Sequence, residues 1–117
     1  MPTQRAGEFV LVLDSDTLGR GDDDLGSILM VNFLRTVAFR DDVPDTVICY
    51  NTGVKLVEQG SDAVPMLDAL AKKGAEIVLC GTCVNHFQIS ERIALGRISN
   101  MQEIVDTLAG ARKVLYS

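Results

Sequence analysis

Four short segments of the chain are rich in apolar and β-branched residues, and each of them predicts a β-strand. They span residues 8–14, 46–50, 75–80 and 113–116, and a minimal fifth strand is expected at residues 97–99. The first segment is apolar at every interior position instead of at alternate positions. That pattern is typical of a parallel strand that is covered on both faces.

A helix is predicted after the first strand, from the three aspartates at residues 22–24 to about Phe39. Carboxylates in a first turn interact favourably with the positive end of the helix dipole. A helix that is apolar on nearly all sides is buried by more than one sheet face, so we expect this one to contact a partner subunit. Its predicted inward stripe is Leu25, Ile28, Leu29, Phe33 and Val37, with Met30, Val31 and Leu34 on the flank.

Two more helices are predicted from their caps. One begins at Ser61-Asp62, tolerates a proline in its first turn and ends at Gly74. The other is capped by Asn100 and covers residues 101–108. Their predicted inward residues are Ala63, Met66, Leu67 and Leu70 in the first, and Ile104, Val105 and Leu108 in the second. Shorter helical pieces are expected within residues 54–60, after Cys83 and at residues 90–95.

The alternation of strands and helices, which closes on a strand, predicts the fold class. Such an order implies right-handed crossovers and an α/β architecture with helices on both faces of a parallel sheet, a three-layer sandwich. A length of 117 residues is sufficient for one well-buried core, so we expect a single domain over residues 1–117.

Composition and charge exclude several classes of protein. The apolar runs are far shorter than the ~20 residues of a membrane span, so no membrane association is expected. The net charge of −5, without any basic run, argues against a nucleic-acid partner. Residues 1–7 contain no apolar signal region, and three cysteines do not suit a disulfide framework. We therefore expect a reducing, cytoplasmic location.

The candidate chemistry lies at Cys80-Gly81-Thr82-Cys83, which follows the third predicted strand. In an open parallel sheet, ligands bind beyond the carboxyl ends of the strands. A sulfur at the start of a helix gains up to about 2 kcal/mol from the dipole, which would bring a thiol pKa from about 8.5 toward 7. Gly81 would allow an incoming group to approach the backbone closely. The motif therefore predicts a reactive thiolate.

Other interpretations of the cysteines remain open. Both sulfurs can be core residues, because free cysteine is often simply buried. A structural zinc site would use Cys80, Cys83 and His86, with Cys49 as the remaining candidate ligand. Thioredoxin-like exchange is disfavoured, since that fold needs a later cis-proline and no proline follows Pro65. His86 either stabilises a thiolate or is an ordinary surface or packed histidine.

The loop after the first strand contains two weaker patterns. Asp14-x-Asp16 looks like the strand-end motif of haloacid-dehalogenase-type phosphatases, but the threonine stands one position early. Gly19-x-Gly21 suggests a phosphate-binding turn, yet three aspartates follow it and would repel a phosphate. We interpret this segment as a solvated capping loop.

Several motifs, in order along nearly the whole chain, together resemble the C-terminal domain of YedF-like proteins. These are sulfurtransferase-like selenium-metabolism proteins of the DsrE/DsrF superfamily. The resemblance implies a five-stranded α/β fold, homo-oligomers and a cysteine that carries persulfide sulfur, with Cys80 in the position of the acceptor. YedF-like proteins commonly carry an N-terminal TusA-like domain, which is not expected in these 117 residues. The motifs are Gly19-x-Gly21, Asp24-Leu25-Gly26, Leu29-Met30, Asn51-x-Gly53-Val54, Cys80-Gly-Thr-Cys83 and Gly96-x-Ile98-Ser99-Asn100-Met101.

The sequence and the resemblance together predict a small sulfur or selenium carrier without a cofactor. Cys80 would take the terminal sulfur of a donor persulfide. Cys83 would either resolve the Cys80 persulfide by forming a disulfide or carry part of the sulfur itself. The groups expected to stabilise the bound sulfur anion are the backbone of Gly81 and Thr82, together with Asn51, Asn100 and His86. The two asparagines are alternatively plain turn and cap residues.

The expected partners are a second copy of the chain and either a TusA-like sulfur-carrier protein or a cysteine desulfurase. Two alternatives are kept beside this hypothesis. One is a non-catalytic oligomeric module that binds a small ligand or a protein at the same sheet edge. The other is the structural zinc site on the same cysteines.

Overall fold

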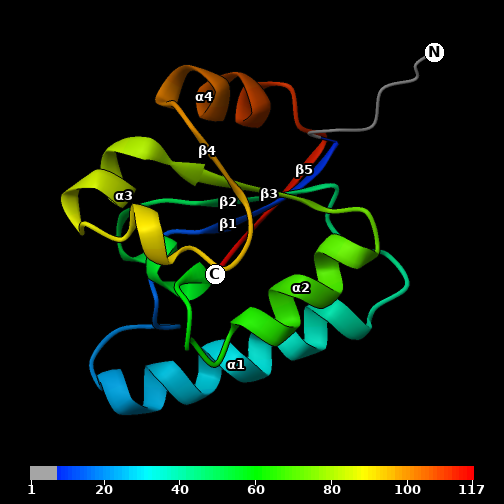
Figure 1. The fold of residues 1–117 in the computed structure, drawn as a ribbon. Helices are drawn as coiled ribbons and strands as arrows, with labels where there is room; N and C mark the ends of the chain where they lie inside the picture. Colours follow the sequence, from blue (N-terminus) through cyan, green and yellow to red (C-terminus); the bar gives the residue numbers. More distant parts are fainter. Residues whose placement is uncertain (1–7) are drawn as a thin grey trace.

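Residues 8–117, which are the part described by the computed structural model, form a five-stranded parallel sheet in the order β4-β3-β2-β1-β5 (Figure 1). All four neighbouring pairs run parallel, as the sequence predicts. The expected lack of an apolar signal region falls on residues 1–7 and lies outside the described residues. The strands are β1 (Phe9–Leu13), β2 (Thr46–Cys49), β3 (Glu76–Cys80), β4 (Arg97–Ser99) and β5 (Lys113–Tyr116).

Helices cover both faces of the sheet, which confirms the predicted three-layer arrangement. Helices α1 and α2 lie side by side on one face, and α4 lies on the opposite face (Figure 1). Between residues 8 and 117, no helix combines the length and apolarity that a membrane crossing requires. The α-helices are α1 (Asp23–Phe39), α2 (Val64–Lys72), α3 (Gly81–His86) and α4 (Met101–Ala109), and the 3-10 helices are η1 (Asn51–Val57) and η2 (Ser90–Arg92).

The central strands separate two cores of unequal size. Leu11 and Leu13 belong to the larger core under α1, α2 and η1, whereas Val10 and Val12 belong to the smaller core under α4. Successive side chains of a strand point to opposite faces, so an apolar residue is needed at every position of β1. This is the physical origin of the continuous apolar run in the sequence.

The predicted inward face of α1 is mostly wrong. Leu25, Ile28 and Leu29 are 52%, 60% and 38% exposed, and Phe33 is only partly buried. The residues of α1 that are buried are Gly26, Met30, Leu34, Val37 and Ala38. Two apolar stripes run along this helix, and the buried one includes Gly26, where a Cβ atom would lie 2.8 Å from Cβ of Thr17 in the preceding loop. Periodicity alone does not distinguish two stripes of similar apolarity.

The remaining elements differ from the prediction mainly at their ends. In α4, Ile104 is buried as expected, but Val105 is 53% exposed. The helical piece expected at residues 90–95 shortens to η2, and the turn expected within residues 54–60 is part of η1. Of the inward residues predicted for α2, only Met66 is incompletely buried.

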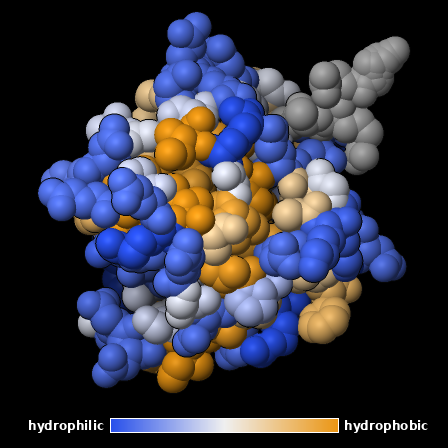
Figure 2. Space-filling model, viewed as in Figure 1, coloured by the Kyte–Doolittle hydropathy of each residue, from blue (hydrophilic) through white to orange (hydrophobic). Residues whose placement is uncertain are grey.

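Strand β4 forms one edge of the sheet and leaves apolar surface in view. Figure 2 shows an apolar area at the centre of the molecule, where β4 crosses in Figure 1, with polar residues around it. Ile98, in the middle of this three-residue strand, is 51% exposed. The carboxyl end of β4 leads directly into α4, beside the end of β3 that carries the cysteine motif.

Candidate functional site

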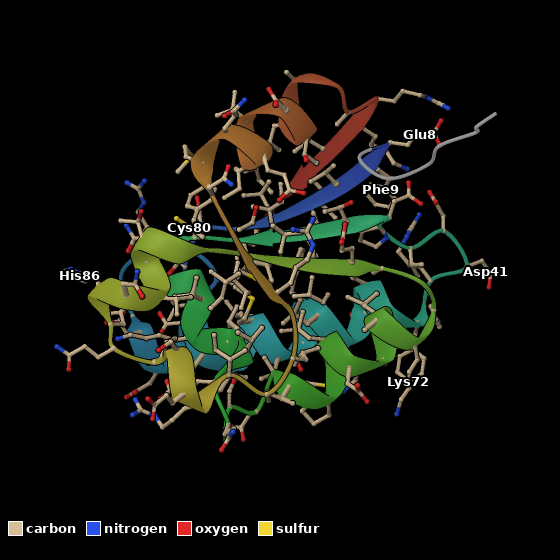
Figure 3. The ribbon with its side chains drawn as sticks, turned by 45° about the horizontal axis from the view of Figure 1, so that its top comes forward. Glu8, Phe9, Asp41, Lys72, Cys80 and His86 are labelled. Carbon is tan, nitrogen blue, oxygen red and sulfur yellow. The ribbon has the colours of Figure 1, made fainter. Side chains whose placement is uncertain are left out.

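The first sulfur of the motif is buried where β3 ends. Cys80 is the last residue of β3 and the N-cap of α3, and its backbone pairs with Ser99 of β4. Its side chain belongs to the smaller core, and the residue is 2% exposed. Figure 3 shows Cys80 at the junction of β3 and α3, with His86 at the far end of that helix. Burial argues against Cys80 as the thiol that first meets a donor.

Cys83 is the accessible sulfur. It lies in the first turn of α3, is only partly buried, and accepts a hydrogen bond from the Asn51 N–H with an N–Sγ distance of 3.0 Å. It also lines a cavity of about 240 Å³ together with Asn51, Thr82, His86 and Phe87. A thiol that is open to a cavity and already holds one backbone donor is the stronger candidate nucleophile of the pair.

The predicted fall in thiol pKa is wrong for Cys83. Partial burial raises the pKa of Cys83, and the neighbouring Cys80 thiol raises it further, while the Asn51 N–H acts in the opposite direction. The cost of removing a thiolate from water outweighs what the Asn51 N–H supplies. Burial also raises the pKa of Cys49, to about 12.

Close packing against β4 explains why residue 81 is a glycine. A Cβ atom at Gly81 would lie 2.8 Å from the Ser99 carbonyl oxygen and 3.2 Å from Cγ2 of Ile98. Strand β4 therefore occupies the space that a side chain at residue 81 would need. Thr82, the next residue, is exposed and does line the cavity.

The two asparagines have different roles. Asn51 touches Cys83 through its backbone N–H, and its side-chain oxygen accepts the Thr52 N–H at 2.8 Å. Asn100 caps α4, since its side-chain oxygen accepts the Glu103 N–H at 2.9 Å, and it lines a separate cavity. The cap alternative therefore describes Asn100, whereas the backbone of Asn51 belongs to the cysteine site.

Two residues near Cys83 were missed from sequence. Phe87 lines the cavity, its ring meets the His86 ring edge to face at 5.0 Å, and Lys55 Nζ lies 4.5 Å from its centroid. The signal was available for Phe87, because residues four apart share one face of a helix. Lys55 comes from η1, and only the tertiary fold brings it here. Phe87 adds an aromatic wall to the cavity, and Lys55 places a cation over that ring.

A zinc site on these cysteines does not fit the structure. Cys49 belongs to the larger core and Cys80 to the smaller one, on opposite faces of the sheet. Over the described range 8–117, no three side chains of the types His, Cys, Asp and Glu converge in a way that would hold a metal ion. A structural zinc site needs four such ligands in tetrahedral geometry.

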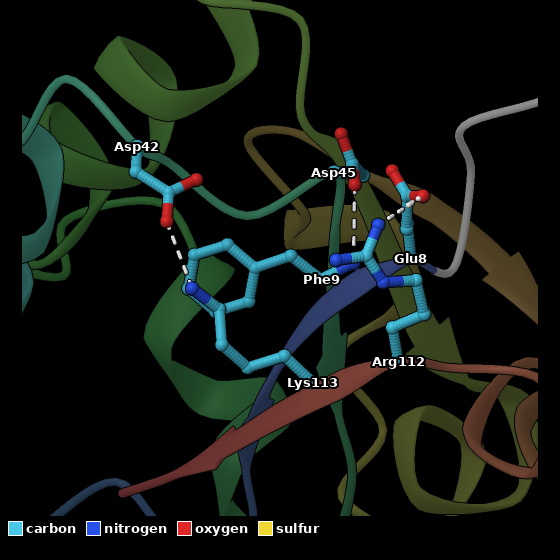
Figure 4. Close-up of a pocket in the computed structure, with 6 residues that line it drawn as sticks. All are labelled: Glu8, Phe9, Asp42, Asp45, Arg112 and Lys113. Carbon is cyan, nitrogen blue, oxygen red and sulfur yellow. Dashed lines mark hydrogen bonds and ion pairs between the residues drawn. The ribbon is translucent and has the colours of Figure 1, made fainter.

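A second cavity, of about 420 Å³, lies at the amino ends of β1 and β5, the edge opposite the cysteines (Figure 4). Its cations are engaged: Arg112 pairs with Glu8 at 2.9 Å, and Lys113 pairs with Asp42 at 2.8 Å. Lys113 also lies 4.1 Å from the ring centroid of Phe9. These contacts attach the start of β5 to the start of β1 and to the loop that contains Asp42. We therefore interpret this group of charged residues as structural.

Comparisons with known proteins agree with this fold. The sequence profile of the DsrE/DsrF-like family matches residues 30–116. The ychN protein from E. coli superposes with a TM-score of 0.70 at 17% identity, over 94% of this chain and 99% of that chain. No curated protein matches the sequence.

Two other solved structures are similar, and both are described as proteins of unknown function. MTH1491 from Methanobacterium thermoautotrophicum gives a TM-score of 0.65 at 18% identity, over 94% of this chain and 98% of that chain. BT1422 from Bacteroides thetaiotaomicron gives 0.65 at 15% identity, over 98% and 99%. At these identities the likeness establishes the fold.

Proposed function

Because the chain belongs to the DsrE/DsrF-like family, which is related to sulfur relay in general, we propose that it is a sulfur carrier that holds a persulfide on Cys83. The observation that carries the proposal is the position of the Cys83 sulfur, which is open to a cavity and 3.0 Å from the Asn51 nitrogen. Cys83 replaces Cys80 as the acceptor because Cys80 is 2% exposed.

The transfer is a thiol exchange. The Cys83 thiolate attacks the terminal sulfur of a donor persulfide, a new S–S bond forms on Cys83, and the donor's own S–S bond breaks. The donor leaves as a thiol, and the proton lost by Cys83 passes to His86 or to water. Since sulfane sulfur only moves between thiols, the step consumes no oxidant or reductant.

Cys80 is the resolving thiol in this proposal. Its thiol is close enough to raise the pKa of Cys83, and it stands three positions before Cys83, a spacing that brings side chains together at a helix start. Attack of Cys80 on the Cys83 sulfur of the persulfide forms a Cys80–Cys83 disulfide. The terminal sulfur then leaves as hydrogen sulfide, so the two thiols are oxidised and the sulfane sulfur is reduced.

The subtype within the family, the location and the partners are proposed from the sequence motifs. We propose a YedF-like carrier of sulfur or selenium that works in the cytoplasm with a TusA-like protein or a cysteine desulfurase. The apolar outer stripe of α1, formed by Leu25, Ile28 and Leu29, supports the proposal that the protein is a homo-oligomer. Asn100 leaves the proposed binding set, because it caps α4.

The carrier proposal is tested by intact mass after incubation with a cysteine desulfurase and cysteine. The native chain should gain one sulfur atom, Cys83→Ala should gain none, and Cys80→Ala should retain its sulfur for longer. Cys49→Ala removes a thiol that lies in the other core and should load like the native chain. A native chain that gains no sulfur, or a Cys83→Ala variant that loads normally, excludes the carrier.

One observation favours a second candidate, a non-catalytic module that binds a small ligand or a protein at the same edge. The raised pKa of Cys83 means that only a small fraction of this thiol is ionised at neutral pH. The binding module predicts that Cys83 resists both iodoacetamide and sulfur loading at pH 7, whereas the carrier requires loading.

A further inference from the structure

The N–H that meets Cys83 belongs to a peptide group that is fixed on both sides. Tyr50 C=O and Asn51 N–H form one planar peptide unit and point in opposite directions. The Tyr50 oxygen accepts the Gly53 N–H at 2.9 Å, while the Asn51 N–H donates to Cys83 Sγ at 3.0 Å. The Tyr50 N–H in turn donates to the Leu13 carbonyl at the end of β1. The direction of the donor therefore depends on how η1 is anchored to the end of β1.

Asn51 has a left-handed backbone conformation, with a φ of 51°. Asparagine tolerates this region better than most residues, but the conformation must still be held by its surroundings. Here its side-chain oxygen accepts the N–H of Thr52, which closes a local ring beside the strained position. The residue that follows Asn51 is thus part of what keeps the turn in shape.

The Thr52 hydroxyl fastens this turn to the loop after β1. It accepts the Asp16 N–H at 3.2 Å and donates to Ser15 Oγ at 3.5 Å. Ser15 Oγ also accepts the Thr17 N–H and shares a hydrogen bond with the Thr17 hydroxyl, both at 3.1 Å. The network runs from the capping loop of residues 15–17 to Thr52, and from there to the Asn51 turn.

The packing next to Thr52 leaves little freedom. A Cβ atom at Gly53 would lie 2.0 Å from the Leu13 carbonyl oxygen, so only glycine fits where η1 crosses the end of β1. With Gly53 pressed against β1 and the Thr52 hydroxyl bonded to the loop, the segment before them is held at two adjacent points. The loop of residues 15–17, interpreted from the sequence as a solvated capping loop, is therefore connected to the Cys83 site.

We propose that Thr52 is a positioning residue whose hydroxyl, anchored on the Ser15–Thr17 loop, keeps the Asn51 N–H directed at the Cys83 sulfur. The contact matters most when that sulfur is negative, because hydrogen bonds to ionised acceptors are stronger than neutral ones. The importance of this hydrogen bond for sulfur transfer rests on the proposed function of Cys83. The role of Thr52 in directing the Asn51 N–H at the Cys83 sulfur does not depend on that function.

The test compares Thr52→Val with Thr52→Ser. Valine has a similar shape without the hydroxyl, and serine keeps the hydroxyl. The rate of Cys83 alkylation by iodoacetamide is followed from pH 7 to 11 by mass spectrometry of the peptide that contains Cys83. In Thr52→Val the apparent pKa of Cys83 should rise by about one unit and the rate at pH 8 should fall about tenfold. Thr52→Ser should keep the native profile, and an unchanged profile in Thr52→Val overturns the proposal.

A second variant addresses folding. Ser15→Ala removes the acceptor of the Thr52 hydroxyl without touching the η1 turn, and it should shift the Cys83 profile in the same direction by a smaller amount. Circular dichroism shows which variants remain folded, and if Thr52→Val unfolds, a native profile in Ser15→Ala overturns the proposal. If the native chain takes up no sulfur but the Thr52→Val shift is found, the carrier is excluded while the positioning role stands.

Discussion

The three thiols of this chain occupy three different environments. Cys49 is wholly buried under α1 and α2, Cys80 is buried under α4, and Cys83 opens on a cavity. Because the thiolate is the reactive form, access to the sulfur and its pKa together determine the order of reaction. Cys83 combines access with a raised pKa, so its reactivity should depend steeply on pH.

Alkylation mapped to each cysteine should show this order. Iodoacetamide should label Cys83 first, and its rate should still rise as the pH passes 9.0, the value from which burial raises the pKa of this thiol. Cys49, with a pKa raised to about 12, should be labelled only when the chain is unfolded in urea. A Cys83 rate that levels off near pH 7 would show that the thiolate is stabilised, contrary to the structure.

The place of the cysteine motif in the fold was predictable, but the surroundings of its two sulfurs were not. The spacing of Cys80 and Cys83 after an apolar run located the site at the end of β3, which the structure places at the carboxyl edge of the sheet. Which sulfur is exposed, and the sign of the pKa shift, depend on packing by α4 and η1, and no local pattern encodes that. The donor from Asn51 stands 32 residues before Cys83 and was foreseen only as a candidate residue.

At the scale of elements, the corner between β4 and α4 is held by an ionic cluster. Arg97 donates to Glu76 of β3 at 2.6 Å and to Glu103 of α4 at 2.9 Å, and the Ser99 hydroxyl also donates to Glu103. These donors, with Arg97 foremost, lower the pKa of Glu103 from 4.5 to about 2. The cluster joins the edge strand to its neighbouring strand and to the following helix.

The pH dependence of stability should report this cluster. A carboxyl whose pKa is lower in the folded state contributes stability that is complete above its unfolded value and is lost as the pH falls through the folded value. For Glu103 that window runs from about pH 4.5 down to about 2. Glu103→Gln should therefore flatten the urea midpoint against pH in this window and lower it at pH 7.

An Arg97→Gln background provides the control for this prediction. There, Glu103→Gln should have little further effect between pH 4.5 and 2, because its main partner is already gone. An equal effect in both backgrounds would mean that the Arg97–Glu103 pair does not account for the lowered pKa.

The elements themselves were largely predictable, because the signals that define them are local. Alternation of apolar runs and capped helices gave the parallel sheet, and even the three-residue β4 was expected before its Asn100 cap. The side of α1 that is buried was not predictable, because this helix has apolar residues on two sides. Only packing against the sheet determines which of the two sides is covered. Element faces depend on tertiary packing more than element types do.

At the scale of the molecule, α1 exposes a row of apolar residues on its outer side. Leu25, Ile28 and Leu29 are spaced as neighbours on one helix face and are all at least partly exposed. Light scattering at micromolar concentration should find an oligomer, and Ile28→Glu should convert it to a monomer by placing a charge in an apolar contact.

Val105→Glu is a matched control for this variant, because Val105 is also about half exposed but lies on α4, across the sheet. It should leave the oligomer intact. A monodisperse native monomer would contradict the proposed assembly, and dissociation by Val105→Glu alone would show that the α1 stripe is not the contact between subunits.

The strand order has a consequence for how the chain is made. Strand β1 lies between β2 and β5, so both of its edges are hydrogen-bonded only after residues 113–116 have paired with residues 9–12. During synthesis β1 can pair with β2 early, but its other edge stays exposed to foreign strands until residues 113–116 have left the ribosome. Deletion of β5 should therefore reduce the solubility of the chain before it changes the environment of the Cys83 sulfur.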